Sequence, residues 1–290
     1  MKIAYVANHG NRGSDDTEGH IAHALEKLGH RVVEIPQRGS PAGIPRSADL
    51  LLFHHWTNVN LGFLAEQPMP KACWYFDKIW NGRDKWIREI APLCERVFMT
   101  DGTWAASSGI QNVSVLRQGI GDRDVRPGTP RPDRWKAQIA FLGSVYGERT
   151  AFVAQLRAKY GERFQVYNDV FNRDLYDLCA TVPILVAPAY PADDHYWSNR
   201  VYLALGSGGF LLHPRLAGLA EEYDDGVHLA TYGSHAELED RIDHYLRHDQ
   251  DRREIAAAGF ARTHDNYSFT KRCQKLLKET LGRSNTGMSA

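Results

Sequence analysis

The chain has 290 residues, enough for one large domain or two of ordinary size. Hydrophobic residues make up 43% of the sequence, which is typical of a globular protein and excludes a fibrous or wholly disordered one. The formal net charge is zero, so the chain as a whole has no field that attracts nucleic acid or an anionic membrane, although a local basic patch stays open.

The first half of the chain alternates strand-like and helix-like segments. A strand over residues 2–7 leads through a glycine loop into a helix, for which Asp15 and Glu18 fit a capping box. The runs that follow are apolar on successive residues, which indicates strands of a parallel sheet covered by helices on both faces. We predict these strands at residues 31–35, 50–53, 72–76, 97–100 and 113–116.

The composition changes after residue 116, where the sequence becomes rich in Arg, Pro and Gly. We predict an interdomain linker over residues 123–136, between a first domain over 1–122 and a second over 137–267. We interpret the arginines of this region as solvated side chains whose charge is partly offset by aspartates. The alternative, that a polyanionic acceptor binds along them, stays open. These arginines are Arg117, Arg123, Arg126, Arg131 and Arg134.

The second half repeats the alternation. We predict strands at residues 139–143, 164–167, 183–188 and 210–212, and helices at about 148–160, 234–246 and 268–282. Residues 283–290 should form a disordered tail. The sequence therefore predicts an α/β protein with two Rossmann-like parallel-sheet domains and a cleft between them.

The first loop of the chain is glycine-rich and contains His9, Gly10, Arg12 and Gly13. Glycines between a strand and a helix let the backbone approach a ligand, and a helix start favours an anion. The spacing is not GxGxxG and no acidic residue ends the second strand, so this is not a dinucleotide fingerprint. A ligand-binding loop and an ordinary turn both stay open.

The corresponding loop of the second half runs from Gly143 through Ser144 to Arg149. Gly143 admits a phosphate close to the backbone, Ser144 offers a hydroxyl, and Arg149 is a forked cation one turn into the helix. This combination favours a diphosphate site over a plain surface arginine.

A further polar segment precedes a short apolar helix and a double glycine. Ser198 or Asn199 would cap that helix, and Arg200 would lie in its first turn, where a cation opposes the helix dipole. A bound anion explains this arginine better than helix stability does, and the alternative is a salt bridge to Asp193 or Asp194. The candidate donor-site residues of this region are Tyr196, Ser198, Asn199, Arg200 and Gly208.

Polar side chains also follow neighbouring strands of the first half, namely His54, Asp77 and Asp101. The carboxyl ends of parallel strands are where open sheets bind ligands. These are the candidate catalytic residues, because each of them can accept a proton from an acceptor hydroxyl. Each alone is also a common kind of loop cap, and that alternative stays open.

We predict no metal site. His20 and His23 lie at helical spacing without an HExxH or cysteine partner, and the acidic pair Asp193-Asp194 lies in a loop. The 4 cysteines form no CxxC pair, which predicts reduced thiols in a cytoplasmic protein. No apolar stretch is long enough to span a membrane, and the opening MKIAYVA does not fit a signal peptide.

Several motifs resemble those of two-domain GT-B glycosyltransferases, especially the spore-maturation-type proteins and their phage-borne relatives. FLGSVYGER looks like the opening of their donor domain, and RVYLALGSGGFLL resembles their arginine, helix, double-glycine and strand signature. GLAEEYDDGVHL is similar to the G-x-x-E…DG run of the large retaining families, and VLRQGI also resembles these proteins. The resemblance implies a retaining, metal-independent transferase without a cofactor, in which a nucleotide-sugar is the donor substrate.

The resemblance also assigns roles. Gly143, Ser144, Arg149 and Arg200 would surround the diphosphate in the second domain, while the first domain would hold the acceptor. Tyr167 and Asn168 would lie near the base. The final helix would cross back to the first domain. Many relatives carry a ribose-binding glutamate where this chain has Leu203, which cannot accept those hydrogen bonds.

These observations favour a glycosyltransferase that moves a sugar to a hydroxyl acceptor. The acceptor stays open among a glycan, a small molecule and a hydroxymethylated base in phage DNA. The alternatives are a nucleotide-sugar epimerase of the same fold and a non-catalytic nucleotide-sugar-binding module, of which Leu203 would be the trace.

Overall fold

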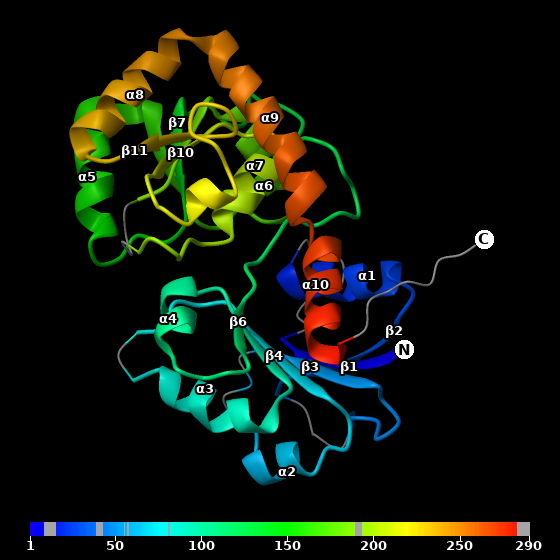
Figure 1. Cartoon of the computed structure of the whole chain (residues 1–290). Helices are drawn as coiled ribbons and strands as arrows, with labels where there is room; N and C mark the ends of the chain where they lie inside the picture. The colour runs from blue at the N-terminus through cyan, green and yellow to red at the C-terminus, as the bar shows by residue number, and fades with distance from the viewer. Residues whose placement is uncertain are drawn as a thin grey trace. The chain divides into compact units, whose positions relative to one another are not determined.

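A computed structural model of the chain describes residues 1–8, 16–38, 43–54, 56, 58–80, 82–188 and 193–282. The chain divides into two compact units (Figure 1). The first unit comprises Met1–Arg123 and Ser268–Ala290, and the second comprises Asp124–Tyr267. Residues 123–136, predicted as a separate linker, are divided between the two units at Arg123 and Asp124.

The first unit contains a six-stranded sheet in the order β2-β1-β3-β4-β5-β6. Every neighbouring pair of strands is parallel. Each predicted strand is present within one or two residues of its predicted bounds. The strands are β1 (Lys2–Ala7), β2 (Arg31–Pro36), β3 (Leu50–Phe53), β4 (Lys71–Tyr75), β5 (Arg96–Met99) and β6 (Val113–Val115).

Helices cover both faces of this sheet, as the unbroken apolar strands predicted. One core cluster joins the sheet to α1 (Thr17–Lys27) and α10 (Phe269–Leu281), which pack side by side (Figure 1). The other cluster contains Ile87 and Ile90 and lies under α3 (Asp84–Ile90). The remaining helices of the unit are α2 (Leu61–Ala65), η2 (Ala91–Leu93) and α4 (Gly102–Ser107).

The helix ends of the first unit correct one prediction. The N-cap of α1 is Asp16, whose side chain accepts a hydrogen bond from Gly19 N at 2.6 Å. The predicted capping box on Asp15 was therefore one residue too early. Ser268 caps α10 by accepting from Lys271 N. Residues 283–290, expected to be disordered, lie outside the described residues.

The second unit contains a five-stranded parallel sheet in the order β11-β10-β9-β7-β8. Its first strand in the chain, β7, lies inside the sheet, with β8 and β9 on its two sides. The polar loops that follow β7 and β9 are therefore neighbours at the carboxyl edge. The strands are β7 (Ile139–Leu142), β8 (Phe164–Tyr167), β9 (Ile184–Val186), β10 (Leu211–Pro214) and β11 (Ala230–Tyr232).

Two apolar clusters again lie on the two faces of this sheet. One contains residues of α6 (Asn172–Thr181) and α7 (Arg200–Gly206), and the other contains residues of α5 (Arg149–Tyr160) and α8 (His235–Arg247). Ser234 caps α8, as predicted. The other elements are η3 (Gly161–Arg163), η4 (Leu219–Glu221) and the long α9 (Asp249–Tyr267), which packs against α7.

The arginine-rich segment is bound to the surface of the second unit. Gly128 N donates to Ser207 O at 2.9 Å, and Thr129 N donates to Asp177 Oδ1 at 2.8 Å. Arg134 forms a bidentate salt bridge with Asp174, in which both N–O distances are 2.6 Å. Arg126 and Arg131 pair with Asp124 and Asp177, so three of the five arginine charges have a carboxylate partner.

Candidate functional site

Two arginines meet at the carboxyl edge of the second sheet. Gly143 directly follows β7, Arg149 begins α5 and Arg200 begins α7. Gly143 has φ +135°, and a Cβ on it would lie 2.7 Å from Arg200 Nη2. Glycine is therefore required here, because it lets the Arg200 guanidinium lie directly against the backbone of the loop.

Arg149 is buried, with only 7% of its surface exposed. Its Nη1 donates to Ser144 O at 3.3 Å, and its guanidinium lies 4.5 Å from the ring centroid of Tyr146. Its Nε is buried and has no hydrogen-bond partner among the described residues. The fork is thus held in place by Ser144 and Tyr146 while part of its bonding capacity stays unused.

Arg200 is half-buried beside this fork. Burial lowers the pKa of Arg200, and the positive charge of Arg149 lowers it further. Among the residues that the structure describes, no carboxylate forms an ion pair with either arginine. Two partly buried like charges without a counterion are costly, and a bound anion would remove that cost.

The salt bridge considered for Arg200 is not formed. Asp193 Oδ1 accepts from His195 N at 2.9 Å, and Asp194 Oδ1 accepts from Ala217 N at 3.3 Å. Asp193 therefore stabilises its own loop, and Asp194 joins that loop to the segment after β10. The ion-pair alternative is excluded for these two residues.

The residues before α7 surround Arg200. Ser198 Oγ accepts from Arg200 Nη1 at 3.3 Å. Tyr196 lies close enough for its charge state to affect the pKa of Arg200. Asn199 occupies the N-cap position, but its side chain makes no capping bond, and its Oδ1 is buried without a partner among the described residues. Asn199 therefore occupies the predicted N-cap position, but the predicted hydrogen bond from its side chain to the helix is wrong.

Tyr167 and Asn168 follow β8, next to the same loop. Tyr167 O accepts from Gly143 N at 2.8 Å, and the Tyr167 ring meets Trp135 edge-on at 5.4 Å. Burial raises the pKa of Tyr167, and Asn168 is exposed. These two residues thus adjoin the arginine pair through the backbone of Gly143.

Gly208 lies apart from this cluster, beyond the other end of α7. It has φ +82°, and a Cβ on it would lie 3.0 Å from Pro127 Cβ. A helix end in the left-handed region and close packing explain this glycine without a ligand. The donor-binding role of Gly208 stays a prediction that this local geometry does not require.

In the first unit, the three candidate catalytic residues follow the adjacent strands β3, β4 and β5. Asp101 caps α4 by accepting from Trp104 N, and its other oxygen accepts from Ile79 N, both at 2.9 Å. His54 Nε2 lies 2.7 Å from the Tyr5 hydroxyl.

Asp101 is therefore a helix cap, which the sequence left open as an alternative, and His54 is buried with only 3% of its surface exposed. The catalytic role of these two residues stays a prediction. Asp77 is exposed after β4 and keeps a carboxylate at the surface. The loop residues His9, Gly10, Arg12 and Gly13 lie outside the described residues.

Tyr146 is a site residue that sequence reasoning missed. More than half of its surface, 55%, is exposed, yet its ring stacks on the Arg149 guanidinium. Its carbonyl also accepts from Arg149 N at 3.2 Å. The available signal was an aromatic residue three positions before the helical arginine, within the same glycine-flanked loop.

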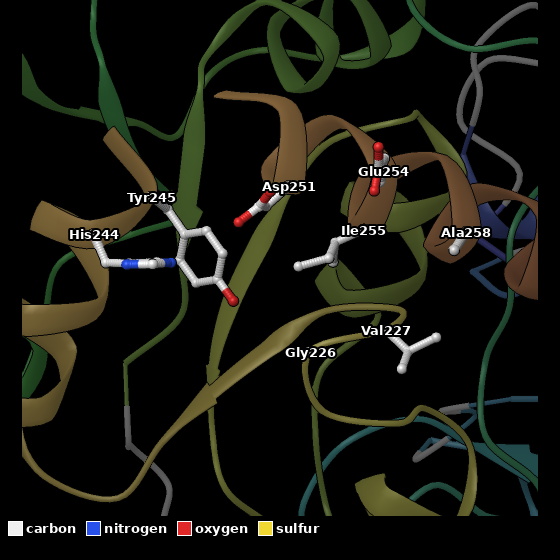
Figure 2. A pocket seen from close by; sticks show the side chains of 8 residues that line it. All are labelled: Gly226, Val227, His244, Tyr245, Asp251, Glu254, Ile255 and Ala258. Carbon is white, nitrogen blue, oxygen red and sulfur yellow. The ribbon is translucent and has the colours of Figure 1, made fainter. Parts of the chain in front are cut away.

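A pocket of about 440 Å³ lies elsewhere in the second unit (Figure 2). It is formed by the loop before β11, the end of α8 and the start of α9, so it lies at the amino edge of the sheet, opposite the arginine pair. Asp251 and Glu254 would repel an anion there. Its lining residues are Gly226, Val227, His244, Tyr245, Asp251, Glu254, Ile255 and Ala258.

Within the described ranges, no group of three or more His, Cys, Asp or Glu side chains is arranged to hold a metal ion. The same part of the chain contains no helix that is both long and apolar enough to cross a bilayer. All 4 cysteines are free and buried.

The fold is that of GT-B proteins, and solved structures of such proteins match nearly the whole chain. Anabaena HepE in complex with UDP and glucose is 14% identical, with a TM-score of 0.65 over 97% of this chain and 99% of that one. An alpha-glucosyltransferase in complex with UDP and a 13-mer DNA containing an HMU base is 7% identical, with a TM-score of 0.72 over 97% and 99%.

T4 phage BGT in complex with UDP-glucose is 12% identical, with a TM-score of 0.61 over 97% of this chain and 99% of that one. A family model described as Glycosyl transferase-like matches residues 131–278, and the chain belongs to this family. The predicted GT-B glycosyltransferase is thereby confirmed. No curated protein sequence matches the chain.

Proposed function

We propose that this protein transfers a sugar from a nucleotide diphosphate-sugar to a hydroxyl acceptor, and that Arg149 and Arg200 bind the donor diphosphate. The supporting observation is that the buried Arg149 and the half-buried Arg200 have no carboxylate partner within the described residues. A diphosphate supplies two negative charges and matches the forked donors of arginine. UDP and UDP-glucose are the natural first probes, since HepE and T4 phage BGT were crystallised with them.

In the reaction, the bond between the anomeric carbon and the diphosphate oxygen breaks, and the acceptor oxygen forms the new bond. The nucleoside diphosphate leaves with the electron pair, and the two arginines stabilise the charge that develops on it. The mechanism we propose needs no metal or other cofactor and retains the anomeric configuration. The acceptor proton goes to Asp77, which stays exposed at the carboxyl edge of the first sheet.

For the acceptor, we propose a hydroxymethylated base in DNA as the first candidate, ahead of a glycan or a small molecule. The fold similarity to an alpha-glucosyltransferase with bound DNA that contains an HMU base supports this order. A cytoplasmic location fits the 4 free, buried cysteines.

The donor site is tested by calorimetry with UDP, UDP-glucose, GDP-mannose and dTDP-glucose. At least one should bind the wild-type protein, and Arg149→Ala and Arg200→Ala should each weaken binding about 100-fold. Equal binding by wild type and both variants would refute the assignment. A donor that binds but gives no product with any acceptor would point to a binding module.

The chemistry is tested by incubating the donor with hydroxymethyluracil-containing DNA, unmodified DNA and no acceptor. We expect product only with modified DNA, in the same anomeric form as the donor and unaffected by EDTA. A product without acceptor would identify an epimerase. Loss of turnover on EDTA treatment would overturn the metal-independent mechanism, and the opposite anomer would overturn retention.

A further inference from the structure

Asn199 lies between two residues of the arginine site, and its amide oxygen accepts no hydrogen bond from the described residues. Ser198, before it, accepts a hydrogen bond from Arg200, after it. Asn199 stands at the N-cap position of α7 with helical backbone angles, φ −55° and ψ −17°. An N-cap side chain normally accepts from a backbone N–H of the first turn, but this one does not.

The amide oxygen of Asn199 is buried and has no hydrogen-bond partner among the described residues. Leaving such an atom unbonded costs as much as a lost hydrogen bond, so native proteins rarely keep one without a reason. The neighbouring Arg149, which is nine-tenths buried, also has an unpartnered Nε. Two unpaired polar side chains in one cluster indicate a ligand that would bond both.

The chemistry of an amide oxygen restricts what that ligand carries. Arg149 and Arg200 require an anion, but an ionised diphosphate has no hydrogen to donate. The group that bonds Asn199 Oδ1 must therefore be a donor attached near the anion. In a nucleotide diphosphate-sugar, the donors next to the diphosphate are hydroxyls of the ribose and of the transferred sugar.

On α7 itself, no side chain other than Asn199 at its N-cap is placed to accept a hydrogen bond from a sugar hydroxyl. The helix is RVYLALG and contains no acidic residue, so no carboxylate on it can accept from hydroxyls. Leu203 follows Asn199 by one turn and lies on the same side, since Leu203 N donates to Asn199 O at 3.0 Å. Leu203 is only partly buried and cannot form hydrogen bonds.

We propose that Asn199 recognises a sugar hydroxyl of the donor, with its neutral amide in place of a carboxylate. This role rests on the proposed function, because it presumes a nucleotide diphosphate-sugar on the arginine pair. Asn199 binds the donor next to its charge without adding a negative charge of its own. It is therefore a specificity residue for the sugar part of the donor.

Calorimetry with three probes tests the proposal, namely inorganic pyrophosphate, UDP and UDP-glucose. Asn199→Leu, of similar size but unable to form hydrogen bonds, should weaken UDP-glucose about 10- to 100-fold. It should change pyrophosphate affinity less than about twofold, since pyrophosphate offers no hydroxyl. Asn199→Asp keeps the acceptor but adds a negative charge, and should weaken pyrophosphate as well.

Asn266→Leu is the matched control, because Asn266 is an exposed asparagine on α9 whose side chain donates to Arg262 O. It should bind all three probes as the wild type does. If Asn199→Leu weakens UDP as much as UDP-glucose, the hydroxyl belongs to the ribose. If it weakens UDP-glucose alone, the hydroxyl belongs to the transferred sugar.

Two results would overturn the proposal. Equal weakening of pyrophosphate, UDP and UDP-glucose by Asn199→Leu and Asn199→Ala would mean that Asn199 only supports the arginines. Unchanged affinity for all three would mean that it contacts no ligand. Failure of the proposed function looks different, because the wild-type protein itself would then bind none of UDP, UDP-glucose, GDP-mannose and dTDP-glucose.

Discussion

The carboxyl edges of the two sheets carry polar side chains in equivalent places, but these side chains differ in their bonding within the protein. In the first unit, both oxygens of Asp101 accept backbone hydrogen bonds, and His54 pairs with Tyr5. In the second unit, the buried Arg149 and the half-buried Arg200 have no carboxylate partner in the described part of the chain. A polar residue after a strand thus indicates a ligand when the fold leaves it unpaired, and structure when the fold satisfies it.

The largest expected effect comes from removing one of the unpaired charges. Arg200→Ala should lower UDP affinity about 100-fold, because a buried charge then lacks its partner in the complex. Its melting temperature should not fall, since one of two repelling charges is gone. Arg134→Ala is the control, because Arg134 is exposed and paired with Asp174. If both variants bind UDP like the wild type, the two edges do not differ as argued.

A methyl group on Gly143 should displace the Arg200 guanidinium, which lies against the Gly143 backbone. Gly143→Ala forces a non-glycine residue to φ +135° and brings Cβ to 2.7 Å from Arg200. We expect a loss of about 2–3 kcal/mol in the free energy of unfolding, with UDP affinity about tenfold weaker.

Gly147→Ala separates the two causes, because Gly147 has φ +56° and a Cβ on it would meet no atom within 4 Å. It should cost about 1 kcal/mol from backbone strain alone and leave UDP affinity unchanged. Equal effects of the two alanines on UDP binding would show that the position of Arg200 does not depend on Gly143.

Acid should destabilise the second unit through His213, which lies in β10 and is buried. Burial lowers the pKa of His213 to about 4, whereas the unfolded chain keeps a value near about 6.5. The unfolded state therefore binds the proton first, and stability falls as the pH drops from about 6.5 towards 4.

The expected loss at pH 5 is about 2 kcal/mol relative to pH 7. Urea unfolding at both pH values measures it, and His213→Leu should remove this part of the loss. An equal fall in the wild type and in His213→Leu would assign the acid sensitivity to other groups.

Substitution of Asp101 tests the carboxyl edge of the first sheet, where the polar side chains are hydrogen-bonded within the protein. Asp101→Ala removes the cap of α4 and the bond to Ile79 N, so it should cost about 1–2 kcal/mol of stability. UDP affinity should not change. Asp77→Ala, at an exposed position, should alter stability by less than about 0.5 kcal/mol but lower the rate of transfer. A stable, inactive Asp101→Ala would support the catalytic role predicted for Asp101.

Much of the fold could be predicted from the sequence, because unbroken apolar runs such as residues 50–53 have few alternatives to buried parallel strands. The arginine cluster was also predictable, since Arg149 and Arg200 follow strands that a parallel sheet brings to one edge. Hydrogen-bond partners were not predictable in this way. Whether Asp101 caps a helix or faces solvent depends on where Ile79 and Trp104 place their N–H groups in three dimensions.

The double glycine shows the same limit. Gly208 fits a phosphate loop equally well by sequence, and only the position of Pro127, far away in the chain, gives it a structural reason. Tyr146 was missed for the converse reason. An exposed aromatic residue in a loop carries no periodic signal, and its contact with Arg149 depends on how the loop turns into α5.

The smallest expected effect comes from substituting Tyr146. The substitution tests how strongly the Tyr146 ring holds the Arg149 guanidinium in place. Tyr146→Ala removes the ring that stacks on Arg149 but leaves the carbonyl that accepts from Arg149 N. An exposed cation–π contact contributes about 0.5–1 kcal/mol, so UDP affinity should fall about two- to fivefold. Tyr146→Phe should keep the wild-type affinity, because the ring and not the hydroxyl makes the contact. Phe171→Ala, at a side chain exposed by 65%, is the control for the loss of a surface aromatic. A larger loss in Tyr146→Phe than in the control would instead mean that the hydroxyl itself binds the donor, since only the hydroxyl distinguishes phenylalanine from the native residue.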